Sequence, residues 1–262
     1  LLLTNIFNHL NNNVFSIILG RFYTEKEVGQ YNQGNKWNYM GHSLISGMIG
    51  SVALPMFSQI SEDKERQQYV FRKMLRFTSF VSFPAMFGLA LIAPEMITIM
   101  ITDKWIASAH ILRMLAVGGA FIPLVNLYSN LSMSKGKSDI YLWNTVSLGI
   151  CQLILIWLLN PFGMFIMIKA YVVLNIAWLF VWHYFVFREI QLSIWNALQD
   201  VLGFALIAAM SMLIAWFFTK EIENIYLLLF SKIVLAAVIY MVVVWVSGAK
   251  TVRECVQYLR KK

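Results

Sequence analysis

The chain has 262 residues, of which 59% are hydrophobic and only 13% charged, whereas ordinary soluble domains carry about 25% charged residues. A soluble fold of this length cannot bury so much apolar surface, so the composition excludes a soluble globular domain and indicates a membrane protein. The formal net charge of +8 could indicate a nucleic-acid partner, but the positions of the basic residues, given below, argue against one.

Long apolar stretches recur along the whole chain. A helix needs about 20 predominantly apolar residues to cross the hydrocarbon core of a bilayer. The sequence therefore predicts an all-α, polytopic membrane bundle of about eight transmembrane helices, joined by short polar links. In chain order the predicted spans are residues 1–21, 33–60, 77–101, 107–133, 139–159, 164–187, 195–218 and 225–248.

The first two spans carry polar stripes at helical spacing. The first stripe contains Asn5, His9, Asn12 and Ser16. The second contains Asn32, Asn35, Lys36, Tyr39, Ser43, Ser46 and Gly50. Polar groups inside a bilayer are costly unless they face protein or water, so two such stripes favour a shared aqueous cavity. The alternative is hydrogen bonding between helices, with Gly47 and Gly50 allowing close packing.

Segment 61–76 follows the second span. Its acidic start favours a helix N-terminus, and Val70, Phe71, Met74 and Leu75 form an apolar stripe. We predict an amphipathic helix on the membrane surface here, the alternative being an ordinary polar connector.

The fourth and sixth spans contain further polar residues. Arg113 and Lys169 could each bind an anion in a cavity, or extend to the outer interface on their long apolar stems. Asn126 and Asn130 are neighbours on one helical face, and Pro123 before them predicts a kink, as Pro84 does in the third span.

Acidic residues are nearly absent from the span interiors. Glu95 is placed near the outer end of the third span and Asp200 about one turn inside the seventh, so we expect no carboxylate in mid-membrane. An exporter of cationic drugs would be expected to need one. Amide and cationic groups instead suit an anionic substrate rich in hydroxyl groups.

Lysine and arginine are distributed unevenly between the two sides of the predicted bundle. With the N-terminus in the cytoplasm, the cytoplasmic links carry thirteen of them and the outer links four. This bias supports an even number of spans and a cytoplasmic C-terminus, and it explains the net charge without nucleic acid. The chain begins at Leu1 without a basic signal-peptide region, and we expect the N-terminal part of a longer protein to precede it.

No motif for catalysis is present. The sequence lacks GxSxG, a P-loop, HExxH and paired carboxylates, and Cys151 and Cys255 have no metal-ligand spacing around them. We therefore expect a protein that is not an enzyme and needs no metal or soluble cofactor.

Three segments resemble the Wzx-type polysaccharide flippases, and most closely their WzxC-like subgroup, within the multidrug/oligosaccharidyl-lipid/polysaccharide exporter superfamily. They are LGRFYTEKEVGQYNQGNK (19–36), KMLRFTSFVSFPAMFGLALIAPE (73–95) and SKGKSD (134–139). In the first, Gly20, Val28, Gly29 and Tyr31 match a family pattern. The resemblance covers most of residues 14–160, and only hydropathy agrees after about residue 190.

The resemblance implies a domain organisation. Family members have two helical bundles, so residues 1–187 would form the second bundle, 188–248 two additional C-terminal helices, and 249–262 a basic cytoplasmic tail. The first bundle would be missing, and this part alone should not transport.

The resemblance also implies a function in the bacterial inner membrane: moving undecaprenyl-diphosphate-linked oligosaccharide outward by alternating access. Lys36 and Arg113 would attract the diphosphate, Pro84 and Pro123 would bend, and the remaining residues would line the cavity. These remaining residues are Asn5, His9, Asn12, Asn32, Asn35, Tyr39, Asn126, Asn130 and Lys169.

Expected partners are the lipid-linked oligosaccharide, membrane lipids and other polysaccharide-assembly proteins, with a monomeric transporter and no nucleic acid. The alternatives are a multidrug exporter of the same superfamily, an integral-membrane polysaccharide polymerase or ligase, and a scaffold of an assembly complex. A polymerase or ligase would be expected to carry a large external loop, which the sequence lacks.

Overall fold

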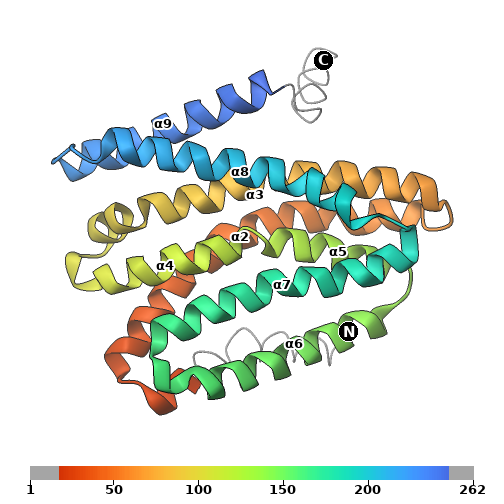
Figure 1. The fold of residues 1–262 in the computed structure, drawn as a ribbon, viewed down its shortest axis with the longest axis horizontal. Coiled ribbons are helices and arrows are strands. Elements are labelled where there is room, and N and C mark those ends of the chain that lie inside the picture. The colour runs from red at the N-terminus through yellow and green to blue at the C-terminus, as the bar shows by residue number, and fades with distance from the viewer. Residues whose placement is uncertain (1–17, 248–262) are drawn as a thin grey trace.

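A computed structural model of the chain describes residues 18–247, which form long α-helices that run side by side (Figure 1). Seven helical segments, with α4 and α5 taken together, are long and apolar enough to cross a membrane. The predicted all-α polytopic bundle is therefore confirmed, while most of the first predicted span and the tail 249–262 lie outside the described residues. The elements are α2 (Glu25–Gln59), α3 (Lys64–Met100), η1 (Asp103–Trp105), α4 (Ile106–Gly119), α5 (Ile122–Ser134), α6 (Ser138–Leu159), η2 (Asn160–Phe162), α7 (Met164–Ile190), α8 (Ile194–Thr219) and α9 (Ile225–Val246).

Helix α2 begins eight residues before the predicted span 33–60. Its N-terminus is a capping box, in which the Glu27 carboxylate accepts a hydrogen bond of 3.0 Å from the Thr24 backbone N–H. The Thr24 hydroxyl in turn accepts one of 3.4 Å from the Glu27 N–H. These bonds satisfy two donors at the helix start, so the polar residues after Thr24 extend the helix.

The predicted surface helix over 61–76 is wrong. The chain turns at 60–63, Asp63 caps the next helix, and α3 then continues from Lys64 to Met100. Phe71 and Leu75 are fully buried, and the Phe71 ring lies 5.0 Å from the Tyr128 ring of α5. The apolar stripe therefore packs against the bundle, because partners from α2 and α5 cover it.

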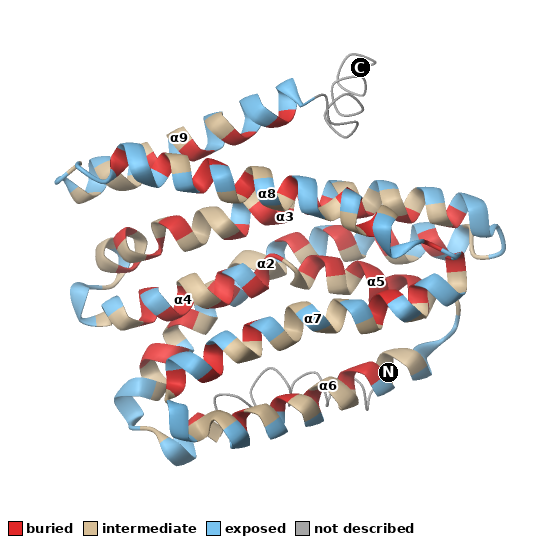
Figure 2. Ribbon diagram, in the orientation of Figure 1, coloured by how far each residue is buried: buried red, intermediate tan, exposed pale blue. Residues whose placement is uncertain are grey.

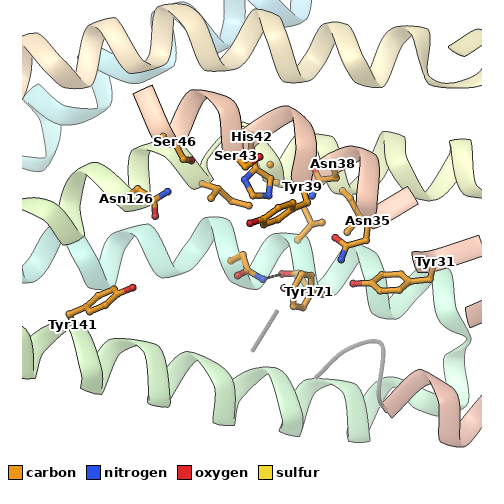
Figure 3. Close-up of a pocket in the computed structure, with 17 residues that line it drawn as sticks. Tyr31, Asn35, Asn38, Tyr39, His42, Ser43, Ser46, Asn126, Tyr141 and Tyr171 are labelled. Atoms are coloured by element: carbon orange, nitrogen blue, oxygen red, sulfur yellow. Dashed lines mark hydrogen bonds between the residues drawn. The ribbon is translucent and has the colours of Figure 1, made fainter. Parts of the chain in front are cut away.

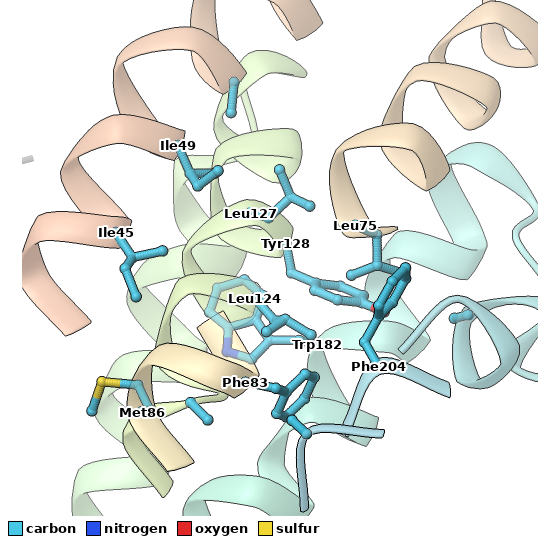
Figure 4. Packing of buried hydrophobic residues seen from close by; sticks show 14 of the residues in the cluster. Ile45, Ile49, Leu75, Phe83, Met86, Leu124, Leu127, Tyr128, Trp182 and Phe204 are labelled. Atoms are coloured by element: carbon cyan, nitrogen blue, oxygen red, sulfur yellow. The ribbon is translucent and has the colours of Figure 1, made fainter. Parts of the chain in front are cut away.

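The centre of the bundle is an apolar core where α2, α3, α5, α7 and α8 meet (Figure 4). Phe83, Leu124 and Leu127 are at most 1% exposed there. The outer faces of α8 and α9 are exposed (Figure 2), as expected for helices that meet lipid.

Two prolines inside α3 leave carbonyl groups without their helical partners. Proline has no N–H, so Pro84 and Pro94 cannot bond the carbonyls four residues earlier, those of Phe80 and Ala90. The Tyr240 hydroxyl of α9 donates to the Phe80 carbonyl at 2.8 Å. Arg113 Nε of α4 donates to the Ala90 carbonyl at 3.2 Å. Side chains of other helices thus replace the missing backbone bonds.

Tyr240→Phe is expected to lower the free energy of unfolding by about 1 kcal/mol, because it removes an interhelical hydrogen bond and keeps the ring. Thermal unfolding of the purified full-length protein in detergent measures this loss. Tyr226→Phe is the matched control on the same helix, since Tyr226 is 67% exposed. Equal stability of the Tyr240 variant and the wild type would show that the bond to the Phe80 carbonyl is dispensable.

The fourth predicted span is broken into α4 and α5 around Ala120 and Phe121, with Pro123 in the first turn of α5. The Ser82 hydroxyl of α3 donates to the Ala120 carbonyl at 2.7 Å, which satisfies a carbonyl at the break. The break thus lies where Pro123 predicts a kink, while a role for it in transport stays a proposal.

The hairpin of α8 and α9 is joined to α3 by three ion pairs. Asp200 accepts from Arg72 Nε at 2.6 Å and from Arg76 at 3.1 Å. Lys232 lies 2.6 Å from Glu95, and both residues are buried. Glu95 therefore lies near the end of α3, as expected, but it is buried against α9 and paired with a lysine.

Candidate functional site

A polar cavity of about 520 Å³ lies between α2, the α4–α5 segment, α6 and α7 (Figure 3). Amide, hydroxyl, phenol and imidazole groups dominate its wall, and no Lys, Arg, Asp or Glu lines it among the described residues. The lining residues are Tyr31, Asn35, Asn38, Tyr39, His42, Ser43, Ser46, Gly47, Leu115, Gly118, Gly119, Ile122, Asn126, Tyr141, Tyr171, Val172 and Asn175.

One face of α2 supplies most of the polar wall. Tyr31, Asn35, Asn38, His42 and Ser46 follow one another at intervals of three or four residues, which places them on one side of a helix. They lie on the side of α2 that faces α7 and the α4–α5 segment (Figure 3). The helix thus presents a continuous row of hydrogen-bonding groups to the cavity.

Three polar atoms on this wall are buried and have no hydrogen-bond partner within residues 18–247: Asn38 Oδ1, His42 Nδ1 and Ser46 Oγ. A buried polar atom without a partner costs about 1–3 kcal/mol. Water or a ligand with hydroxyl groups can supply the missing hydrogen bonds. The wall is therefore chemically suited to a polar, uncharged ligand surface.

The opposite wall is held in place by its own hydrogen bonds. Asn175 Oδ1 accepts from Gln152 Nε2 at 3.1 Å, and Asn175 Nδ2 donates to the Tyr171 carbonyl at 2.7 Å. These two bonds fix the orientation of the Asn175 amide.

Glycines set the distance between α2 and α4. A Cβ built on Gly34 would lie 2.8 Å from the Ser108 carbonyl oxygen, and one on Gly119 would lie 2.3 Å from Asn38 Oδ1. Both distances are too short for a side chain. The close approach of the two helices holds Asn38 at the cavity wall.

Five residues of the predicted stripe and site line the cavity: Asn35, Tyr39, Ser43, Ser46 and Asn126. Asn32, Lys36 and Lys169 are exposed and do not line it, and Asn130 is buried near Gly50. Asn5, His9 and Asn12 lie outside the described residues.

Arg113 does not line the cavity either, and it is half-buried against α3. Neither of the two alternatives raised for it, an anion site or extension to the outer interface, accounts for its bond to the Ala90 carbonyl. Its visible role is to satisfy the carbonyl that Pro94 leaves open.

Sequence reasoning missed several lining residues, of which Asn38 and His42 on α2 and Tyr171 and Asn175 on α7 are the most polar. The spacing of Tyr31, Asn35, Asn38 and His42 was a signal that could have identified the α2 pair. No set of three or more His, Cys, Asp or Glu side chains in the described part of the chain could hold a metal ion.

The fold is similar to that of a solved membrane protein. The lipid II flippase MurJ in an inward closed conformation matches with a TM-score of 0.76 over 91% of this chain and 50% of that chain. The sequences are only 17% identical, so this likeness establishes the architecture alone.

Sequence comparison identifies the kind of relative. The family of polysaccharide biosynthesis proteins matches residues 1–110. An uncharacterised membrane protein in the cps region of Klebsiella pneumoniae is 32% identical over 53% of this chain and 29% of its own length. The teichuronic acid biosynthesis protein TuaB of Bacillus subtilis is 26% identical over 68% and 35%, and the lipopolysaccharide biosynthesis protein WzxC of Escherichia coli is 27% identical over 52% and 28%.

These matches agree with the resemblance to proteins of surface-polysaccharide biosynthesis such as WzxC, and the seven apolar helical segments make the chain a multi-pass membrane protein. The chain spans about a third of the length of the curated relatives that it matches.

Proposed function

We propose that the chain is part of a flippase that moves an undecaprenyl-diphosphate-linked oligosaccharide across the bacterial inner membrane for surface polysaccharide synthesis. The observation that carries this proposal is the cavity wall of amides and hydroxyls, with three buried polar atoms that lack partners. Sugar hydroxyls both donate and accept hydrogen bonds, so they can complete such a wall. The relatives named for lipopolysaccharide and teichuronic acid biosynthesis support the same class of substrate.

The proposed arrangement follows the two-bundle architecture. Residues 1–187 contribute the second bundle, 188–248 the two additional helices, and a missing first bundle completes the transporter. Alternating access then consists of one bundle rocking against the other around the cavity. The C-terminus lies in the cytoplasm and the transporter acts as a monomer.

Within this proposal Asn35, Tyr39 and Asn126 contact the sugars, and Asn38 and His42 join them. Lys36 is retained as the residue that attracts the diphosphate, since it is exposed on α2 beside Asn35. The wall itself carries no cation among its described residues, so the diphosphate would bind at the edge of the cavity and the sugars inside it.

Complementation tests the proposal. The full-length protein is expressed in a bacterium that lacks its own polysaccharide flippase but has the matching glycan pathway, and surface glycan and trapped lipid-linked intermediate are measured. Asn35→Leu/Asn126→Leu is expected to reduce surface glycan about tenfold or more, because two hydrogen-bonding groups are lost. Asn32→Leu is the matched control, since Asn32 is on the same helix but does not line the cavity.

The outcomes separate the site from the function. Restoration by the wild type with no loss in the double variant would leave the flippase in place and remove this cavity as its sugar site. Failure of the folded, inserted wild type to restore surface glycan would overturn the flippase itself. Lys36→Glu tests the diphosphate role in the same assay, and unaltered export would remove that role.

A further inference from the structure

A second hollow lies at the end of the bundle where α3 and α6 begin and α7 ends. It measures about 510 Å³ and shares no lining residue with the polar cavity. Its wall combines charged side chains with two apolar ones. The described lining residues are Lys64, Lys137, Asp139, Ile140, Phe185, Arg188 and Glu189.

The wall of the hollow contains more basic than acidic side chains. Glu189 is already paired with Lys137 at 2.5 Å. Asp139 lies in the first turn of α6, where the helix dipole favours a negative charge. The exposed side chains of Lys64 and Arg188 make no hydrogen bond or ion pair with the rest of the described chain. Two cations are therefore available to an incoming anion.

A third lysine adds positive charge beside the hollow. Lys135, in the link between α5 and α6, donates to the Ser61 carbonyl. Burial lowers the pKa of Lys135, Glu189 opposes this effect, and the charges of Lys64 and Lys137 add to it. The lysines thus repel one another, and a bound anion would relieve this repulsion.

The position of the hollow matches the surface of the bilayer. Lys64 is the first residue of α3, Asp139 the second of α6, and Arg188 lies two residues before the end of α7. Gln68 of α3 donates to the Ile190 and Gln191 carbonyls at 3.1 and 3.2 Å, which holds these helix ends together. Ile140 and Phe185 lie one turn or less inside the charged residues, toward the membrane interior.

We propose that this hollow binds the phosphate-bearing headgroup of a membrane lipid. Arg188 and Lys64 contact the phosphate, since a guanidinium matches its oxygens in pairs and an ammonium supplies a point charge. Ile140 and Phe185 contact the first carbons of the lipid tail. The phosphate belongs either to an anionic phospholipid or to a polyprenyl diphosphate.

Lipid binding to the purified full-length protein tests this site without measuring transport, so its failure is distinct from failure of the proposed function. Affinities for phosphatidylglycerol, phosphatidylcholine and undecaprenyl diphosphate are measured by native mass spectrometry. Lys64→Gln/Arg188→Gln is expected to weaken binding of the anionic lipids about thirtyfold, the combined effect of two basic groups at a membrane surface. Lys26→Gln/Lys104→Gln removes the same charge at the opposite end and is expected to leave the affinity unchanged.

Equal losses in both double variants would overturn the site, because they would show a general effect of charge. No loss in either would overturn it as well. A loss for phosphatidylglycerol identifies a bulk phospholipid as the ligand, and a loss confined to undecaprenyl diphosphate identifies the transported lipid. Unchanged thermal unfolding of the Lys64→Gln/Arg188→Gln protein confirms that it is folded, as expected for two exposed residues.

Discussion

Lys232→Met is expected to lower the free energy of unfolding by about 3–5 kcal/mol, because removing one partner of a buried ion pair leaves the other charge uncompensated. The Lys232 ammonium lies 2.6 Å from Glu95 Oε1, and the second oxygen, Oε2, has no hydrogen-bond partner among the described residues. Glu95 thus has no substitute for Lys232. Chemical or thermal unfolding of the full-length protein in detergent measures the loss.

The double variant Glu95→Met/Lys232→Met separates the cost of an unpaired charge from the value of the pair. Apolar residues of similar volume often replace a buried pair without loss, so the double variant is expected to regain most of the stability. Lys220→Met is the surface control, since Lys220 is exposed in the turn between α8 and α9. A double variant as unstable as Lys232→Met would contradict this account.

Gly119→Val is expected to destabilise the protein by about 1–3 kcal/mol, the usual cost of overfilling a packed site, and to reduce export. A Cβ at residue 119 would lie 2.3 Å from Asn38 Oδ1 and 2.6 Å from Met86 Cε. Asn38 would have to leave the cavity wall, so packing and the proposed sugar site are disturbed together. Unfolding and complementation measure the two effects separately.

Gly203→Ala supplies the control for this substitution. A Cβ at Gly203 meets nothing within 4 Å, and the residue lies inside α8. Alanine there is expected to leave export unchanged and to stabilise by about 0.5–1 kcal/mol, since glycine disfavours a helix. Normal stability and export in the Gly119 variant would show that the contact between α2 and α4 is looser than described.

Hydropathy predicted the helices well because each span must be apolar whatever it packs against. It could not predict that α3 begins at Lys64 and therefore includes most of the segment 61–76. The basic residues there are typical of a membrane surface, but Phe71 packs against Tyr128, which is distant in the sequence, and against Phe57, which lies before the turn. Leu75 is buried in the same core. Only tertiary contacts distinguish a stripe that meets lipid from one that meets protein.

The sequence predicted only some of the residues that line the cavity, again because it does not show how the helices pack. Helix α2 carries one polar row through Asn32 and Lys36 and another through Asn35, Asn38 and His42, and composition does not distinguish them. The contact of Gly34 and Gly119 with neighbouring helices decides which row faces inward. Hydropathy could not predict ion pairs such as Glu95–Lys232 either, because it carries no information on contacts between spans. These two residues are separated by 137 positions in the chain.

The two carbonyls of α3 that its prolines leave without helical partners receive their hydrogen-bond donors at different times during synthesis of the chain. The donor to the Ala90 carbonyl, Arg113, follows it by only 23 residues in the chain. The donor to the Phe80 carbonyl, Tyr240, follows it by 160 residues. At about 5–20 residues per second, translation needs roughly 8–30 s to cover that interval. The nascent α3 therefore spends this time in the membrane with an unsatisfied carbonyl four residues before Pro84, until the α8–α9 hairpin is inserted and supplies the donor.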